Sequence, residues 1–403
     1  MTIYPLLDRN RAVRQNVPIY SSHFDLIRGL AALAVMIGHL KFFLGGIGSP
    51  ARGRGGFVPP LAANPNQMNP AHEAVIVFFV LSGVLVGGSV LRERRTKSFS
   101  WNIYLLRRLS RLLTVLIPAL LLGFVVDSAT RHLLLHYAAR FTTALGDLSY
   151  IALDWRTFLG NLCFVQTLDT TRIRPFGTNV ALWSLSFEFW YYLLFPMLVG
   201  ALLLRSRRRQ VIYSLLAILV ACLLWKDPLS RFPIWLLGAL VTQLPPFLPE
   251  RWQRLAIALL AMQFVACAGF LWIRPLPNFL LDDMILGLSF TALIAAILHR
   301  RSFQPKGLYA SFAEHLAKPS YSVYLFHVPI MTFLGTWAAL YFPILLGHRP
   351  AAILLIGSVV YTLCYLLYFA FESRTDRVRD AAGQLFGFRR IRRVAVLGGE
   401  AAS

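Results

Sequence analysis

An arginine and a histidine within one long apolar run are the residues of this chain best placed to do chemistry. Arg28 and His39 stand eleven positions apart in a run that reads as one membrane helix from about residue 24. Eleven residues at about 100° each leave the two side chains about 20° apart around the axis and about 16 Å apart along it. Each ionisable side chain costs about 2.5 to 3.5 kcal/mol to place in hydrocarbon. The pair therefore indicates a buried site that connects two depths of a membrane.

Each of these two residues also has a structural interpretation. Arg28 lies near one end of the run, where an arginine can extend its charge to the lipid headgroups. His39 lies about 22 Å beyond Phe24, in the outer half of the bilayer, and can be a packing histidine. Desolvation favours the neutral imidazole, which can accept a proton as a general base does. We expect His39 to be catalytic.

Glu188 is a third ionisable residue in an apolar run, 183–192 (WSLSFEFWYY). It lies about 8 Å below Trp183 on a helix that enters from the outer side. A carboxylate in the membrane is expected to be paired, and His39, at a comparable depth, is one candidate partner. Such a carboxylate would orient the imidazole and stabilise its protonated form during turnover. The alternative is a structural hydrogen bond to a serine or a tyrosine.

The arginine run at 107–111 (RRLSR) opens the third predicted span. Arg108 and Arg111 share a helix face. They are either ordinary positive charge at the cytoplasmic boundary or a clamp for a polyanionic ligand such as a phosphorylated cofactor. His132 and His136 stand four apart without a neighbouring carboxylate or cysteine, and we expect no metal site there.

Composition predicts an all-α integral membrane protein. Of the 403 residues, 57% are hydrophobic and only 14% charged. We expect a bundle of about ten transmembrane helices, because ten apolar runs could cross about 30 Å of hydrocarbon. The runs at 211–224 and 232–244 are short for this purpose. The runs lie near 25–44, 73–91, 112–128, 181–204, 211–224, 232–244, 255–273, 280–298, 321–340 and 351–371.

The positive charge follows the loops between these runs. With ten alternating spans, one face carries 24 lysine and arginine residues and the other 12. The basic face is expected to be cytoplasmic, and an even number of spans puts both termini there. This distribution argues against nucleic acid as a partner, despite the net charge of +22. We expect a multi-pass protein of a bacterial cytoplasmic (inner) membrane.

One membrane domain is expected to fill most of the chain. Its predicted bounds are 24–371, between a cytoplasmic segment at 1–23 and a basic cytoplasmic tail at 372–403. The first run lacks a cleavage signal beside it and is expected to stay as an anchor. The longest outer segments are 45–72 and 129–180. Within the second, 155–168 predicts a short helix that does not span and could cover a cavity mouth.

Five motifs in order give the chain a resemblance to the membrane acyltransferase-3 family, whose members O-acylate sugars and other hydroxyl compounds with acyl-CoA. The resemblance covers most of the chain. The motifs are 25–29 (DLIRG) followed by His39, 78–83 (FFVLSG), Arg108-x-x-Arg111, 183–188 (WSLSFE) and 320–327 (SYSVYLFH).

This resemblance implies a ten-helix core with His39 as the essential catalytic residue. It also implies that Arg28, Arg108 and Arg111 lie near the acyl-CoA, and that Glu188 belongs to the site. The chain departs from the family in having Phe187 and Phe189 beside Glu188, and no hydrolase-like domain is expected after the last span. Further positions for acceptor binding or structure are Asp25, Ser82, Trp183, Ser184, Tyr192, Tyr321 and His327.

The expected reaction moves an acyl group from cytoplasmic acyl-CoA to a hydroxyl of a cell-envelope or extracytoplasmic glycan. Acetyl is the acyl group that we expect. The phosphates of coenzyme A would stay at the basic end, and the thioester would reach His39. Direct transfer is favoured, and a brief acyl-enzyme is the alternative. Acetyl-CoA or another acyl-CoA is then a co-substrate, with no permanently bound cofactor. The acceptor would enter below the 129–180 segment, with Trp183, Trp190 and Tyr192 as stacking surfaces.

Two other classes of protein share some of these features. A proton-coupled transporter of a sugar or small anion also uses arginine, histidine and glutamate in the membrane, but the chain lacks the paired, related halves typical of such carriers. A scaffolding membrane protein would need no ionisable stripe in its first helix. Both are therefore less favoured than an acyltransferase.

Overall fold

The computed structural model describes residues 22–46, 70–136, 151–168, 171–245, 248–274, 276, 278–298 and 307–387. Most of this backbone is helical, and within these ranges no strand forms, only an isolated bridge between Ala152 and Gly177. The all-α membrane fold predicted from the sequence is confirmed. Most of the 45–72 loop, part of the 129–180 segment, nearly all of the N-terminal segment and the end of the tail lie outside the described residues.

Within the described ranges, eight helices are long and apolar enough to cross a membrane, and they lie where the apolar runs predict them. The second is one continuous rod with a π-helical turn, η1, in its middle. The π turn begins at Gly83, the last residue of the FFVLSG motif. The eight are α1 (Ser22–Gly46), α2–η1–α3 (Pro70–Ser82, Gly83–Gly87, Gly88–Arg95), α4 (Trp101–His136), α7 (Leu182–Leu203), α10 (Glu250–Ile273), α11 (Phe279–Leu298), α13 (Ser320–Tyr341) and α15 (Arg349–Ala370), which continues through η3 (Glu372–Arg374) into α16 (Thr375–Leu385).

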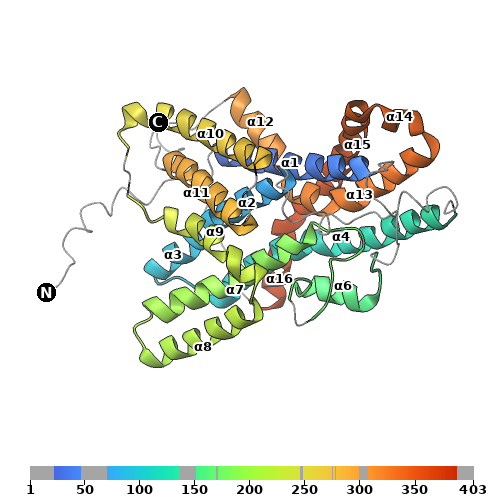
Figure 1. Cartoon of the computed structure of the whole chain (residues 1–403). Helices are drawn as coiled ribbons and strands as arrows, with labels where there is room; N and C mark the ends of the chain where they lie inside the picture. The colour runs from blue at the N-terminus through green and yellow to red at the C-terminus, as the bar shows by residue number, and fades with distance from the viewer. Residues whose placement is uncertain are drawn as a thin grey trace, which may run out of the picture.

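The two short apolar runs also form helices, but neither reaches the length of a full span. α8 (Arg207–Leu223) has 17 residues and α9 (Asp227–Val241) has 15. At 1.5 Å per residue they are about 26 and 23 Å long, less than the 30 Å or so of hydrocarbon. The count of ten crossings therefore stays a prediction. In Figure 1, α7 and α8 lie side by side as a hairpin.

Three shorter helices complete the described part of the chain. α6 (Trp155–Leu162) is the predicted short helix, although it ends six residues before position 168. Asp154 caps it by accepting bonds from the Thr157 amide at 2.9 Å and hydroxyl at 2.7 Å, and these bonds lower the pKa of Asp154. α12 (Leu308–Ala317) and α14 (Pro343–Gly347) were not predicted from the sequence.

Two glycines allow α9 to approach the rod of α2 and η1 backbone to backbone. A Cβ atom on Gly83 would lie 2.0 Å from the Trp235 carbonyl oxygen, and one on Gly238 would lie 2.0 Å from the Val80 carbonyl oxygen. Any side chain at either position would force the two helices apart. This contact brings the Trp235 side chain beside the FFVLSG motif.

Five helices surround the interior that matters for function. α1 contacts α2 and α13, α13 contacts α4, and α2 contacts α7. Figure 1 shows these helices crossing in the middle of the bundle, with α9, α10 and α11 to one side and α14 and α15 to the other. Residues far apart in the sequence therefore meet between α1, α2, α4, α7 and α13.

Candidate active site

A cavity of about 140 Å³ lies between α1, α2, α4, α7 and α13. Apolar side chains, many from α2, form much of its wall, and polar groups from all five helices complete it. Each of the five sequence motifs contributes at least one side chain. Eight residues singled out from the sequence line the cavity: Arg28, Ser82, Arg108, Arg111, Ser184, Glu188, Tyr192 and Tyr321.

The two arginines of α4 are held over aromatic rings. The guanidinium carbon of Arg108 lies 5.9 Å from the ring centres of both Tyr104 and Tyr192, and that of Arg111 lies 5.7 Å from the ring centre of Tyr321. Within the described ranges neither guanidinium forms a salt bridge or hydrogen bond. Both therefore have N–H groups available to an anion.

The other two arginines near the cavity have acidic partners. Arg107 points to Glu93, with its Nη1 atom 2.9 Å from the carboxylate, and it does not line the cavity. Arg28 lies 3.3 Å from Asp25 and donates at 3.4 Å to the carbonyl oxygen of Ala317. Asp25 therefore partly neutralises Arg28, while Arg108 and Arg111 keep their full charge.

Hydroxyl groups hold the carboxylate of Glu188. The Ser82 hydroxyl donates to Glu188 Oε1 at 2.8 Å, and the Tyr192 hydroxyl donates to the same oxygen. Trp235 Nε1 donates to the Ser82 oxygen at 3.1 Å, which fixes that hydroxyl in turn. The local reason is helical spacing, because Tyr192 lies one turn after Glu188 on α7.

The predicted pairing of His39 with Glu188 is wrong. His39 Nδ1 lies 2.8 Å from His327 Nε2, and the two rings are nearly parallel, at 9°. Depth along the membrane was a poor guide to the partner, because the rotation of α7 about its own axis turns Glu188 towards Ser82 of α2. The alternative structural interpretation, a bond to serine or tyrosine, describes Glu188 correctly.

The hydrogen bonds of His327 assign the tautomers of both histidines. His327 is fully buried, and its Nδ1 atom lies 2.8 Å from the Val323 carbonyl oxygen and 3.1 Å from that of Tyr324. A carbonyl can only accept, so Nδ1 carries the hydrogen and Nε2 of the neutral ring accepts. His39 Nδ1 must then donate to His327. The lone pair of His39 is left on Nε2, where a general base needs it.

Tyr324 lies between the cavity and the histidine pair. It lines the cavity, its hydroxyl bonds to Ser184, and it also donates at 3.2 Å to the Ala181 carbonyl oxygen. Its ring centre is 6.4 Å from that of His327. Neither His39 nor His327 lines the cavity. The reactive end of a bound donor would have to pass Tyr324 to reach His39.

Trp183, Trp190 and Tyr192, which were predicted as stacking surfaces for the acceptor, have different surroundings in the structure. Trp183 packs edge-to-face on Phe187, with ring centres 5.0 Å apart. Trp190 uses its Nε1 atom to donate at 2.9 Å to the Phe164 carbonyl oxygen. Tyr192 lies in the cavity with Glu188. At about 100° per residue, Trp183 and Trp190 lie about 20° apart around α7, two turns from each other, and Tyr192 points to nearly the opposite side.

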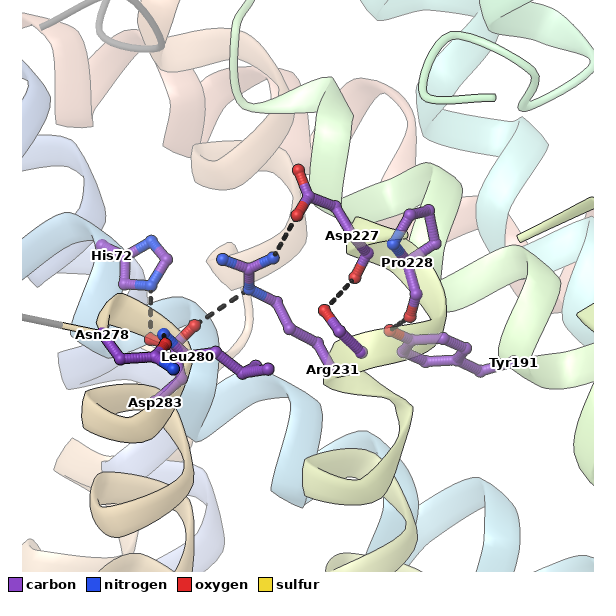
Figure 2. A network of polar contacts seen from close by, with 9 residues as sticks. His72, Tyr191, Asp227, Pro228, Arg231, Asn278, Leu280 and Asp283 are labelled. Atoms are coloured by element: carbon purple, nitrogen blue, oxygen red, sulfur yellow. Dashed lines mark hydrogen bonds and ion pairs between the residues drawn. The ribbon is translucent and has the colours of Figure 1, made fainter. Parts of the chain in front are cut away.

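The structure also contains a buried charged cluster that the sequence analysis missed. The carboxylate of Asp283 is fully buried and accepts from His72 Nε2 at 2.7 Å and Arg231 Nε at 2.9 Å. Arg231 Nη1 reaches Asp227 at 3.5 Å (Figure 2). His72 also stacks on Trp183, with ring centres 6.2 Å apart. A search for ionisable residues inside every apolar run would have found Asp283 in α11.

The comparisons with known proteins agree with this arrangement. The family model of the acyltransferase-3 family, an acyltransferase domain, matches residues 22–369. The chain belongs to this family. Membership of this family argues against the rival classes, a transporter and a scaffold.

Two relatives are O-acetyltransferases named OatA, from Staphylococcus aureus strains NCTC 8325 / PS 47 and COL. Each is 23% identical over 362 residues, which cover 82% of this chain and 54% of the relative. The chain thus spans about half the length of the curated relatives it matches. No solved structure matches the chain.

Proposed function

We propose that this chain is a membrane O-acetyltransferase that moves an acetyl group from acetyl-CoA to a hydroxyl of a cell-envelope glycan. The family supports acyltransferase activity, and the names of the relatives support acetyl as the acyl group. The observation that carries the choice of donor is the cavity itself, where three arginines lie beside an apolar wall formed largely by α2.

Coenzyme A suits this cavity in charge and in shape. Its phosphates are anions that arginine binds by paired, charge-assisted hydrogen bonds. Arg108 and Arg111 form no salt bridge or hydrogen bond in the described part of the chain. The pantetheine arm is thin and uncharged, so it can lie against the apolar wall that α2 contributes to the cavity. The acyl-thioester would then extend past Tyr324 towards His39.

His39 acts as the general base in this proposal. Its Nε2 atom takes the proton of the acceptor hydroxyl as the hydroxyl oxygen attacks the thioester carbonyl carbon. The new C–O bond forms, the C–S bond breaks, and the leaving thiolate receives the proton from His39. His327 accepts a hydrogen bond from His39 Nδ1 throughout and keeps the ring in the required orientation.

The orientation in the membrane is part of the proposal. We infer that the basic loops and both termini are cytoplasmic, that the enzyme lies in a bacterial cytoplasmic membrane, and that the acceptor approaches from the other side. Residues 24–371 would form the catalytic domain and 372–403 the cytoplasmic tail. Reporter fusions after residues 210 and 305 should report the cytoplasm, and fusions after 60 and 160 the outer side. A cytoplasmic signal at 160 contradicts this topology.

The direct test uses membranes that contain the protein, labelled acetyl-CoA and a mixture of envelope glycans. We expect label to move to glycan in proportion to the amount of protein. Membranes with a folded His39→Ala variant are the matched control. Absence of labelled glycan in the presence of folded wild-type protein, across several glycan preparations, would overturn the proposed function.

A further inference from the structure

Glu188 carries one oxygen that the protein leaves unused. Oε1 accepts from the hydroxyls of Ser82 and Tyr192, and in the described part of the chain Oε2 accepts no hydrogen bond. The residue lines the cavity and is only partly buried. Leaving a carboxylate oxygen without a donor away from bulk water is costly, so this oxygen is suited to a ligand with a hydrogen to donate.

The carboxylate cannot easily turn to exchange its two oxygens. Two hydroxyl donors converge on Oε1, and one of them, Ser82, accepts from Trp235 Nε1 at 3.1 Å. Trp235 is fully buried and is held where α9 packs on α2 and η1. Three helices therefore determine which oxygen faces the protein and which faces the cavity.

The charge of the cavity restricts what the ligand can be. Arg28, Arg108 and Arg111 line the same cavity, and no salt bridge joins Glu188 to any arginine of the described chain. Three guanidinium groups with one carboxylate disfavour a cationic donor such as an ammonium group. The ligand must offer anionic groups to the arginines and a neutral hydrogen-bond donor to Glu188.

We propose that Glu188 Oε2 binds an amide N–H of the pantetheine arm of the acyl donor. The inference rests on the proposed function. Coenzyme A offers both kinds of group on one molecule, with phosphates for the arginines and two secondary amides on an otherwise uncharged arm. Glu188 is then a donor-binding residue that sets how far the thioester extends beyond the arginines, and it takes no proton in the reaction.

The test replaces the amide N–H in the ligand. Two acetyl-CoA analogues are needed, each with one pantetheine amide converted to an ester, so that an oxygen stands where the N–H was. With wild-type enzyme, one of the two should lose about 10- to 100-fold in kcat/KM, the usual effect of one charge-assisted hydrogen bond. Equal use of both analogues and acetyl-CoA overturns the inference.

Glu188→Gln sharpens the test because the hydroxyls of Ser82 and Tyr192 require an acceptor. They will hold the amide oxygen of the glutamine and turn its NH₂ group into the cavity, where the carboxylate presented Oε2. The preference for the amide ligand should vanish or invert in this variant, since the ester oxygen can accept where the amide N–H cannot. Glu93→Gln, which removes a carboxylate outside the cavity, should keep the wild-type preference.

Three outcomes remain distinguishable. If Glu188 moves a proton in the reaction, Glu188→Gln will lower kcat by the same factor for all three donors, and the ratio between donors will not change; this overturns the inference. If calorimetry detects no binding of coenzyme A to wild-type enzyme and the enzyme transfers no acetyl group, the proposed function itself is wrong. If Glu188→Gln does not fold, Tyr192→Phe, which removes one of the two hydroxyls on Oε1, should reduce the preference partially.

Discussion

Two polar clusters in the described bundle differ in whether the protein itself supplies the partners of their charged groups. In the charged cluster of His72, Asp283 and Arg231, both oxygens of the buried carboxylate are bound by side chains of the protein. In the cavity, neither Arg108 nor Arg111 forms a salt bridge or a hydrogen bond in the described part of the chain, and one oxygen of Glu188 accepts nothing. The first cluster is complete without a ligand, and the second is not.

This difference distinguishes buried charges that hold helices together from buried charges that bind a ligand. A cluster that satisfies its own hydrogen bonds joins helices, here α2, α9 and α11, and losing one member leaves a buried charge unpaired. A cluster whose hydrogen-bond donors and acceptors have no partner within the protein can bind a ligand with them. Substitutions should therefore affect stability in the charged cluster and activity in the cavity and at the histidine pair.

The largest effect is expected at His39. His39→Ala should lower transfer about 10²- to 10⁴-fold, the usual contribution of a general base, and His39→Gln should be nearly as inactive because its amide takes up no proton. Stability should fall by no more than about 1 to 3 kcal/mol, since only the bond to His327 is lost. Transfer assays and thermal unfolding in detergent measure the two. His315→Gln, an exposed control, should stay active. More than about a tenth of wild-type transfer in folded His39→Ala contradicts the assignment.

The next effect is expected on stability, in the charged cluster. Asp283→Asn keeps the shape of the side chain but leaves Arg231 without its buried counter-charge, and breaking such a pair costs about 3 to 5 kcal/mol. The unfolding temperature in detergent should fall, while transfer per folded molecule stays close to wild type. An Asp283→Asn protein with normal unfolding temperature and lost transfer would show that this cluster is functional and would break the comparison.

A smaller effect, now on donor affinity, is expected for the two arginines of α4. Arg108→Ala and Arg111→Ala should each raise the KM for acyl-CoA, since one charge-assisted bond to phosphate is worth about 1.5 to 3 kcal/mol. The unfolding temperature should fall little, because neither guanidinium forms a salt bridge or a hydrogen bond in the described structure. Steady-state kinetics with varied donor and fixed acceptor measure this. If a folded double variant has unchanged donor affinity, the alternative interpretation holds, in which both residues are ordinary positive charge at the membrane boundary.

The smallest effect is expected at the edge of the charged cluster. Asp227 contacts Arg231 at 3.5 Å, but its side chain is 84% exposed. Exposed ion pairs contribute about 0 to 1 kcal/mol. Asp227→Ala should therefore leave the unfolding temperature within about a degree or two of wild type, next to the large loss at Asp283. A loss as large as that of Asp283→Asn would show that the whole cluster, and not its buried core, holds the helices together.

Several parts of the site follow from the sequence because they depend on one helix at a time. The spacing of Arg108 and Arg111 puts both on one face of α4, and the structure brings that face to the cavity. Arg28 and His39 belong to one helix for the same reason. The short helix α6 was predicted from its length and polarity, although its end was placed six residues too late. Helix ends depend on capping contacts that reach beyond the apolar run.

What the sequence by itself determined is where the long helices lie, which ionisable residues they carry, and the family to which the chain belongs. Hydrophobic length and helical period are local properties, so a single sequence contains them. Only the tertiary structure decided that His39 pairs with His327, that Glu188 bonds to Ser82, and that His72 and Arg231 meet on Asp283. Those pairings depend on how each helix is rotated and how closely it approaches its neighbours. Close contacts between helices, such as that of Gly83 with α9, set these rotations. The hydrophobic period along a single helix does not contain this information.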